Sequence, residues 1–207
     1  MSNYITMNNE MMAMTSQAKT AGRPRDRRID EAVIAATREL LVSEGYSALS
    51  LAAVAGLAGT NTPAIYRRWP TKVHLVHEAA FPEALASGET TGDLRADVEG
   101  MVRATAELFS DPVVRAALPG LVSDLHPHPE LHRELMGKLW VARLDELQEQ
   151  LDRAADAGLV RPGVQAEHLL GVIGGSALLS VLTPSGQQLD DAWIAAIAAL
   201  VLEGITP

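Results

Sequence analysis

The chain has 207 residues, of which 47% are hydrophobic, and a formal net charge of −9 at pH 7. This apolar content supports a buried core and excludes an intrinsically disordered chain. The sequence contains no cysteine, which excludes disulfides, thiol catalysis and cysteine-ligated zinc.

The N-terminal part of the chain is basic although the whole chain is acidic. Residues 1–72 carry nine Lys and Arg against six Asp and Glu, whereas residues 73–207 carry eight against twenty. We interpret residues 1–21, which are polar and contain five methionines, as a disordered lead. A basic arm at residues 22–28 follows. One end of the molecule can therefore face phosphate while the acidic remainder stays away from it.

The first predicted helix follows the basic arm. Its apolar residues recur at helical spacing, and Gly45 is placed to end it. They are Ile29, Val33, Ala36, Leu40 and Leu41.

Residues 49–76 predict two short helices joined by a tight turn, and then the start of a further helix. Ser50 can cap the first short helix and Asn61 the second, because both side chains can accept a backbone N–H. Gly59 lies in the turn, where only glycine adopts a positive φ without strain. Pro63 is tolerated because it lies in the first turn of its helix. Two short helices joined by such a turn are typical of a helix-turn-helix DNA reader.

This segment resembles the DNA-binding domain of TetR-type (TetR/AcrR) transcriptional repressors over roughly residues 25–80. The residues that match the pattern of that family, without a gap, are Ser50, Val54, Ala55, Ala58, Gly59, Asn61, Ile65, Tyr66, Trp69, Thr71, Lys72 and Leu75. The resemblance implies that residues 22–71 form the arm and the DNA-binding domain, and that residues 72–207 bind ligand and dimerise.

The same resemblance assigns DNA contacts. Thr62, Pro63 and Ala64 are expected to face base edges in the major groove, and Tyr66 and Arg67 to contact phosphates. Arg68 is expected to reach either phosphate or guanine. Lys72 is expected to meet a phosphate at the start of the next helix. The remaining candidates are Arg23, Arg25, Ser50, Asn61 and Thr71. Arg23 and Arg25 resemble arms that enter the minor groove, with a solvated basic tail as the alternative.

The rest of the chain predicts further helices and no strand, so we expect an all-α protein. The fourth helix should run from about Lys72 to Ala86. Later helices are expected near residues 93–109, 112–125, 129–157, 165–183 and 189–204. No signal-peptide pattern or membrane-length apolar run is present, so we expect a cytoplasmic protein without a membrane partner.

The resemblance places an effector pocket among these later helices. Apolar and Met side chains suit an adaptable cavity for a mostly apolar small molecule, although each one can instead be ordinary core. The candidates are Met101, Phe109, Leu121, Leu125, Met136, Trp140, Arg143 and Leu144. Asp124 is a further polar group that could orient a ligand.

The last two helices are apolar on several faces and must be buried. In the resembling family, this pair packs against its two-fold mate as a four-helix bundle. The alternative is burial inside one chain. The residues expected at a homodimer interface are Leu170, Ile173, Ala177, Val181, Trp193, Ile197, Leu200 and Val201.

We therefore expect a ligand-responsive transcriptional regulator, a repressor that binds a palindromic DNA operator as a dimer. The alternative is a small-molecule-binding dimer with a vestigial DNA head, because Ala52, Ala53 and Gly56 offer DNA little. We expect no enzyme and no cofactor, since no nucleophile–base pair, phosphate loop or paired carboxylates stand out. His126, His128 and His132 lie around two prolines without a fourth ligand, so we expect no metal.

Overall fold

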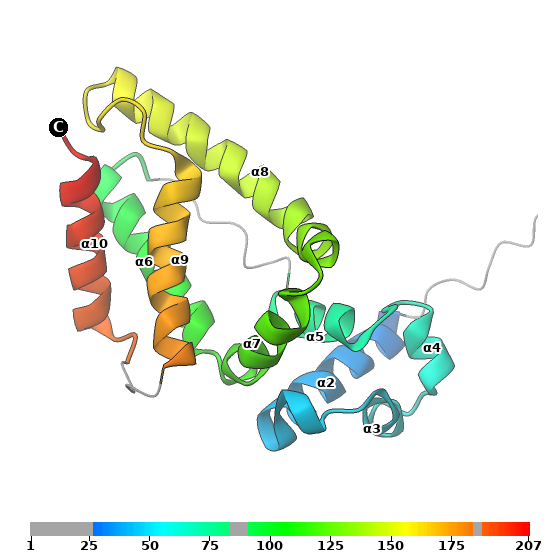
Figure 1. Cartoon of the computed structure of the whole chain (residues 1–207). Coiled ribbons are helices and arrows are strands. Elements are labelled where there is room, and N and C mark those ends of the chain that lie inside the picture. Colours follow the sequence, from blue (N-terminus) through cyan, green and yellow to red (C-terminus); the bar gives the residue numbers. More distant parts are fainter. Residues whose placement is uncertain (1–26, 83–90, 184–187) are drawn as a thin grey trace, which may run out of the picture.

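The computed structural model describes residues 27–82, 91–183 and 188–207, and of His132 and residues 136–143 it describes the backbone alone. The described residues form helices and no strand, which confirms the predicted all-α fold (Figure 1). The helices are α2 (Arg27–Ala48), α3 (Leu51–Leu57), α4 (Thr62–Tyr66), α5 (Lys72–Ala80), α6 (Leu94–Ser110), α7 (Pro112–Leu125), α8 (Pro129–Asp156), α9 (Ala166–Leu182) and α10 (Asp191–Ile205). The predicted lead and most of the basic arm lie outside the described residues.

Two details of the N-terminal helices depend on single residues. The helical conformation of α2 breaks at Gly45, where φ is 79°, in agreement with the sequence. The helix expected to run from Lys72 to Ala86 instead ends at Ala80, because Phe81 has left the helical region. The residue before a proline disfavours helical angles, and Pro82 follows Phe81.

Three of the later helices, α6, α7 and α10, begin where an aspartate side chain caps them. Asp93 accepts the N–H of Ala96 at the start of α6, and Asp111 accepts that of Val113 at the start of α7. Asp190 does the same for α10. The helix starts predicted from the sequence agree with the structure to within a few residues. No helix in the described residues is long and apolar enough to cross a membrane.

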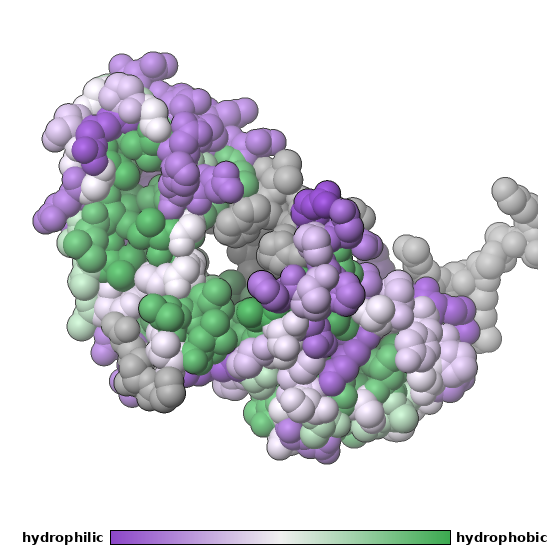
Figure 2. Space-filling model, viewed as in Figure 1, coloured by the Kyte–Doolittle hydropathy of each residue, from purple (hydrophilic) through white to green (hydrophobic). Residues whose placement is uncertain are grey.

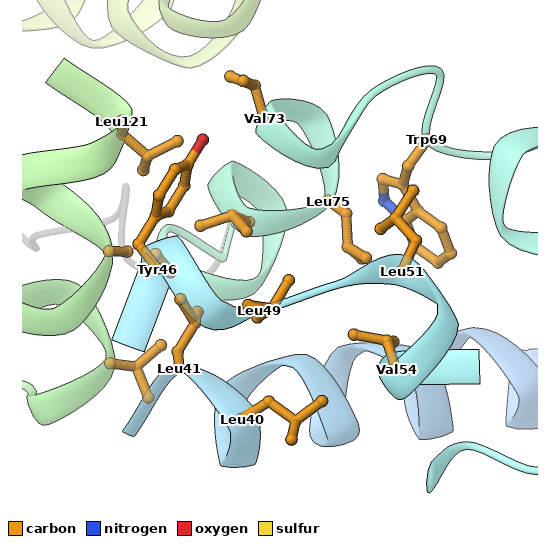
Figure 3. Packing of buried hydrophobic residues seen from close by; sticks show 14 of the residues in the cluster. Leu40, Leu41, Tyr46, Leu49, Leu51, Val54, Trp69, Val73, Leu75 and Leu121 are labelled. Carbon is orange, nitrogen blue, oxygen red and sulfur yellow. The ribbon is translucent and has the colours of Figure 1, made fainter. Parts of the chain in front are cut away.

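The buried residues form two hydrophobic cores. The first joins α2, α3, α4 and α5 with α7 (Figure 3). The second joins α6, α8, α9 and α10. In Figure 1, α7 lies between the N-terminal helices and the bundle of α6, α9 and α10.

The first core crosses the domain boundary that the sequence placed after residue 71. Both α5 and α7 lie beyond that residue, yet both contribute fully buried side chains, among them Leu75, Val76 and Val114. Phe109, at the end of α6, packs against both cores. The short N-terminal helices are thus held in place by a helix from the other part of the chain.

Candidate nucleic-acid interface

Helix α3 presents three small residues and one leucine to solvent. Its start is fixed by the Ser50 hydroxyl, which accepts the N–H of Ala53 at 3.2 Å. Leu51, Val54 and Ala55 are buried against α2 and its neighbours. The exposed residues are Ala52, Ala53, Gly56 and Leu57. This face can approach a phosphate backbone closely but offers no side-chain donor.

The turn between α3 and α4 requires glycine. Gly59 has φ 64°, in the left-handed region that other residues enter only at a cost. The N–H of Thr60 reaches back to the Ala55 carbonyl at 2.9 Å. Asn61 then caps α4, because its side-chain oxygen accepts the Ala64 N–H at 2.9 Å. The turn is therefore closed by its own hydrogen bonds.

Helix α4 is anchored by one buried face. Ile65 and Trp69 are buried, and Trp69 Nε1 donates to Glu78 Oε2 of α5 at 2.7 Å. The anchored face leaves Pro63, Tyr66 and Arg67 exposed, while Thr62 and Ala64 are half-buried. The short helix therefore projects a proline, a phenol and a guanidinium from one protruding edge.

Two cations that the sequence directed towards DNA turn towards their own chain. Arg68 forms an ion pair with Asp30 of α2, and both side chains are partly buried. The Lys72 ammonium donates to the Tyr46 carbonyl at 2.5 Å and lies 4.2 Å from the centroid of the Tyr46 ring. In this conformation neither side chain points outward as a phosphate ligand would.

The environment of Lys72 also changes its proton affinity. Burial lowers its pKa, because the charged form is desolvated, and the negative charge of Asp124 partly opposes this effect. The pKa of Tyr46 is raised, mainly by burial and then by its hydrogen bond to Asp124. At neutral pH the phenol keeps its proton and acts as a donor.

The other predicted DNA residues divide into caps and residues outside the described part. Ser50 and Asn61 use their side chains as caps, and Thr71 caps α5 by accepting the His74 N–H. Thr71 Oγ1 also lies 2.8 Å from His74 Nδ1. Arg23 and Arg25 precede the described residues. The contacts predicted for all of these residues remain predictions.

The predicted pocket residues are distributed over both cores. Leu121 and Leu125 are buried in the first core, and Met101 and Leu144 pack against the second. The side chains of Met136, Trp140 and Arg143 lie outside the described residues. Asp124 accepts the hydroxyl of Tyr46 at 2.5 Å and does not line a described cavity.

Two surface hollows among the described residues lie elsewhere. One of about 530 Å³ lies between the start of α6 and the end of α10, near Leu94, Leu159 and Leu202. The other, of about 300 Å³, lies beside the ion pair of Arg103 and Asp191. Neither includes a predicted pocket residue, so the effector site remains a prediction.

Half of the predicted dimer residues are buried within their own chain. The buried ones, all in the second core, are Ile173, Ala177, Trp193 and Val201. They have almost no surface left for a partner, and contact with a second subunit through them remains a prediction. Leu170, Val181 and Ile197 are half-buried, and Leu200 is 65% exposed.

The interface residues predicted from the sequence do not include a second apolar stripe, which α9 exposes to solvent. Val172 is 59% exposed and Leu179 is 60% exposed, and Leu182 follows on the same side. Their spacing, with Gly175 between them, repeats at three and four residues, as on a helix-packing face. Figure 2 shows apolar surface over α9 and α10 on the face drawn there. Apolar residues surround α9, so the sequence carries no periodicity that separates this exposed surface from the buried one.

Comparison with known proteins gives consistent matches over both halves of the chain. The family described as "Bacterial regulatory proteins, tetR family" matches residues 33–79. The family described as "Tetracyclin repressor-like, C-terminal domain" matches residues 88–201, more than half of the chain.

Individual relatives and structures agree with these families. The chain is 28% identical over 180 residues to a DNA-binding transcriptional repressor, TetR, of Mycobacteroides abscessus, with 83% of this chain and 90% of that one covered. It is 27% identical over 179 residues to an uncharacterised HTH-type transcriptional regulator of Mycobacterium tuberculosis, with 84% and 86% covered. The crystal structure of the TetR family transcription regulator SCO0332 has a TM-score of 0.65 at 27% identity, covering 87% of this chain and all of that one.

The orientation of the cations predicts different salt responses. We expect Arg67→Ala to reduce the slope of log affinity against log salt by about 0.9 for each DNA-bound subunit, since one phosphate contact is lost. Lys72→Ala should change this slope less and should lower the melting temperature, because the Tyr46 carbonyl loses its donor. Titrations at several salt concentrations, with Arg95→Ala on α6 as control, measure both effects. A larger slope change in Lys72→Ala than in Arg67→Ala, with unchanged stability, would contradict this assignment.

Proposed function

The chain belongs to the TetR family of helix-turn-helix transcriptional regulators, and on that premise we propose that it is a repressor that binds a palindromic operator as a homodimer. The observation that carries this proposal is the α3–turn–α4 unit, whose outer edge presents Pro63, Tyr66 and Arg67. The unit is capped and anchored on its inner side, so it can enter a groove without rearranging. We propose that the protein acts in the cytoplasm, bound to DNA.

The residues at the start of α4 would recognise the DNA sequence. Thr62, Pro63 and Ala64 are the residues that would meet base edges. The Thr62 methyl and the Pro63 ring suit thymine methyls, and a threonine hydroxyl can donate or accept. Tyr66 and Arg67 would contact phosphates, which fix register and orientation. Helix α3 would add little readout, because none of its exposed side chains can form a hydrogen bond.

Dimerisation would use the exposed apolar surface of α9 and α10. Val172, Leu179 and Leu182 on α9 and Leu200 on α10 expose large aliphatic side chains to water. Removing such side chains from water contributes about 25 cal/mol for each Å² of apolar surface. The exposed glycines Gly171 and Gly175 on α9 would allow a partner helix to approach closely. We call helices α2 to α5 (Arg27–Ala80) the reading head. A two-fold arrangement of the dimer places two reading heads against two half-sites of the DNA.

An apolar effector would release the operator. Helix α6 carries Met101 and Phe109, and α8 carries Leu144 together with Met136, Trp140 and Arg143, which the family resemblance also assigns to the pocket. A ligand there can act only if it binds the DNA-incompetent arrangement more tightly than the competent one. Helix α7 would transmit the change, because it packs on α2 and α5 of the reading head.

One observation favours a second candidate, a ligand-binding dimer with a vestigial head. The exposed face of α3 is small and uncharged, and Arg68 and Lys72 are engaged with their own chain. Such a protein would bind the effector but show no preference for any DNA sequence.

Selection from random double-stranded DNA tests the proposal against this candidate. We expect a two-fold symmetric site to be enriched. Thr62→Ala should cost on the order of 1–3 kcal/mol at one position of each half-site and little on non-specific DNA. Thr105→Ala on α6 should select the wild-type site. Enrichment of no sequence would favour the vestigial head, and an identical site for Thr62→Ala would exclude Thr62 as a base reader.

A charge introduced on the exposed apolar surface of α10 tests the dimer. Leu200→Glu should raise the dissociation constant of the dimer at least about a hundredfold, since burying an unpaired charge costs on the order of 3 kcal/mol. Val42→Glu is the matched control, because Val42 is an aliphatic residue of α2 with a comparable exposure of 55%, against 65% for Leu200. Analytical ultracentrifugation measures both. A wild-type monomer at micromolar concentration, or an unaffected Leu200→Glu dimer, would exclude this interface.

Thermal stability reports effector binding. A compound present at a hundredfold excess over its dissociation constant should stabilise the protein by about 2.7 kcal/mol. We expect apolar hits from a melting-temperature screen to lower operator affinity, and operator to weaken their binding by the same factor. Trp140→Ala should reduce their affinity. Hits that stabilise the protein but leave operator affinity unchanged would show that their site is not coupled to DNA.

A further inference from the structure

Tyr46 is packed directly against the backbone of α7. Its ring lies in the first core beside Leu121, and 9% of the residue is exposed (Figure 3). A Cβ added to Gly120 would overlap Cδ1 and Cγ of this ring and would lie 2.6 Å from Cε1. Only glycine at position 120 therefore lets the ring occupy this place. Gly120 follows Pro119, so α7 combines two weak helix formers where the ring sits.

Polar contacts hold the same residue from two helices. The Tyr46 hydroxyl donates to Asp124 Oδ2 of α7 at 2.5 Å. The Tyr46 carbonyl accepts from the Lys72 ammonium of α5, which also lies over the ring. The ring, the hydroxyl and the carbonyl of Tyr46 each contact another helix, so Tyr46 cannot shift without breaking at least one of these contacts.

The position of Tyr46 in the chain connects this contact to the reading head. Tyr46 follows the break at Gly45, and only three residues separate it from Ser50, the cap of α3. Leu49, in between, is buried. Such a short, anchored segment transmits a displacement of Tyr46 to the start of α3.

A second attachment fixes the other end of α7. Arg38 Nη2 donates to Asp111 Oδ2 at 3.0 Å, and Arg38 Nη1 donates to the Ala79 carbonyl of α5 at 2.7 Å. Asp111 is also the cap of α7. Attached at both ends, α7 cannot pivot freely on the head.

We infer that Tyr46 is a positioning residue. Its contact with Gly120 and Asp124 fixes the orientation of the reading head relative to helices α9 and α10, which carry the proposed dimer surface. This inference rests on the proposed dimeric DNA binding. Its consequence is specific: the contact sets the distance and angle between the two heads of a dimer, and thereby the spacing of half-sites that they accept. It contributes little to the affinity of one head for one half-site.

The test compares operators that differ only in spacing. The site selected by the wild-type protein is prepared as selected and with one base pair added or removed at its centre. One base pair moves a half-site by about 3.4 Å and rotates it, so a rigidly held pair of heads should discriminate. Dissociation constants are measured for each operator and for a lone half-site.

Gly120→Ala should displace the Tyr46 ring and reduce the discrimination between spacings by about tenfold, the size of a typical coupling between sites. Its affinity for the lone half-site should match that of the wild type. Asp124→Ala, which removes the acceptor of the Tyr46 hydroxyl but leaves the ring in place, should act in the same direction to a smaller extent. Gly100→Ala is the matched control, because a Cβ at this helical position in α6 meets nothing within 4 Å.

The outcomes separate the inference from the proposed function. A wild-type protein that selects no symmetric site would overturn both. Sharp wild-type discrimination that persists in Gly120→Ala and Asp124→Ala would overturn the inference alone. So would a variant that loses half-site affinity with unchanged discrimination, because Tyr46 would then only stabilise the fold. If Gly120→Ala does not fold, Asp124→Ala decides the question.

Discussion

The reading head depends on hydrophobic contact with α7, a helix that follows it by more than thirty residues in the chain. Five large side chains of α7 lie in the first core: Val113, Val114, Leu118, Leu121 and Leu125. At about 1.5–3 kcal/mol for each buried aliphatic side chain, their burial is worth on the order of 10 kcal/mol. That equals the whole net stability of a typical domain. The head is therefore not an independent unit joined by a linker, and any movement of α7 changes the packing of its core.

Cationic side chains also hold the helices of the reading head to one another and to α7. Arg38, Arg68 and Lys72 hold helices together through Asp111, Asp30 and the Tyr46 carbonyl. Arg67 makes no ion pair with any described residue and is exposed. Among the described residues, Arg38, Arg68 and Lys72 are thus engaged with their own chain, and the remainder of the chain has an acidic balance. Under the proposed function, affinity would rely on shape, on two heads acting together and on the correct spacing between them.

The features that the sequence predicted well are local. Gly59, Asn61 and the spacing of Ile65 and Trp69 determine a capped helix, a turn and a buried face within a dozen residues. The orientation of Arg68 and Lys72 was not predictable in this way, because their long side chains choose partners on α2 that are distant in sequence. On α9, apolar residues surround the helix, so Val172 and Ile173 look alike until packing buries one and exposes the other.

Native-state hydrogen exchange tests most directly whether the head and α7 are one cooperative unit. The account predicts that core amides of α2, α5 and α7 open together, with one free energy and one denaturant dependence, as a single unit of stability does. Leu41, Val76 and Leu121, all almost fully buried in the first core, are suitable reporters. Amides of α2 and α5 that stay protected while those of α7 exchange would contradict it, because the head would then be stable without the helix on which this account makes it depend.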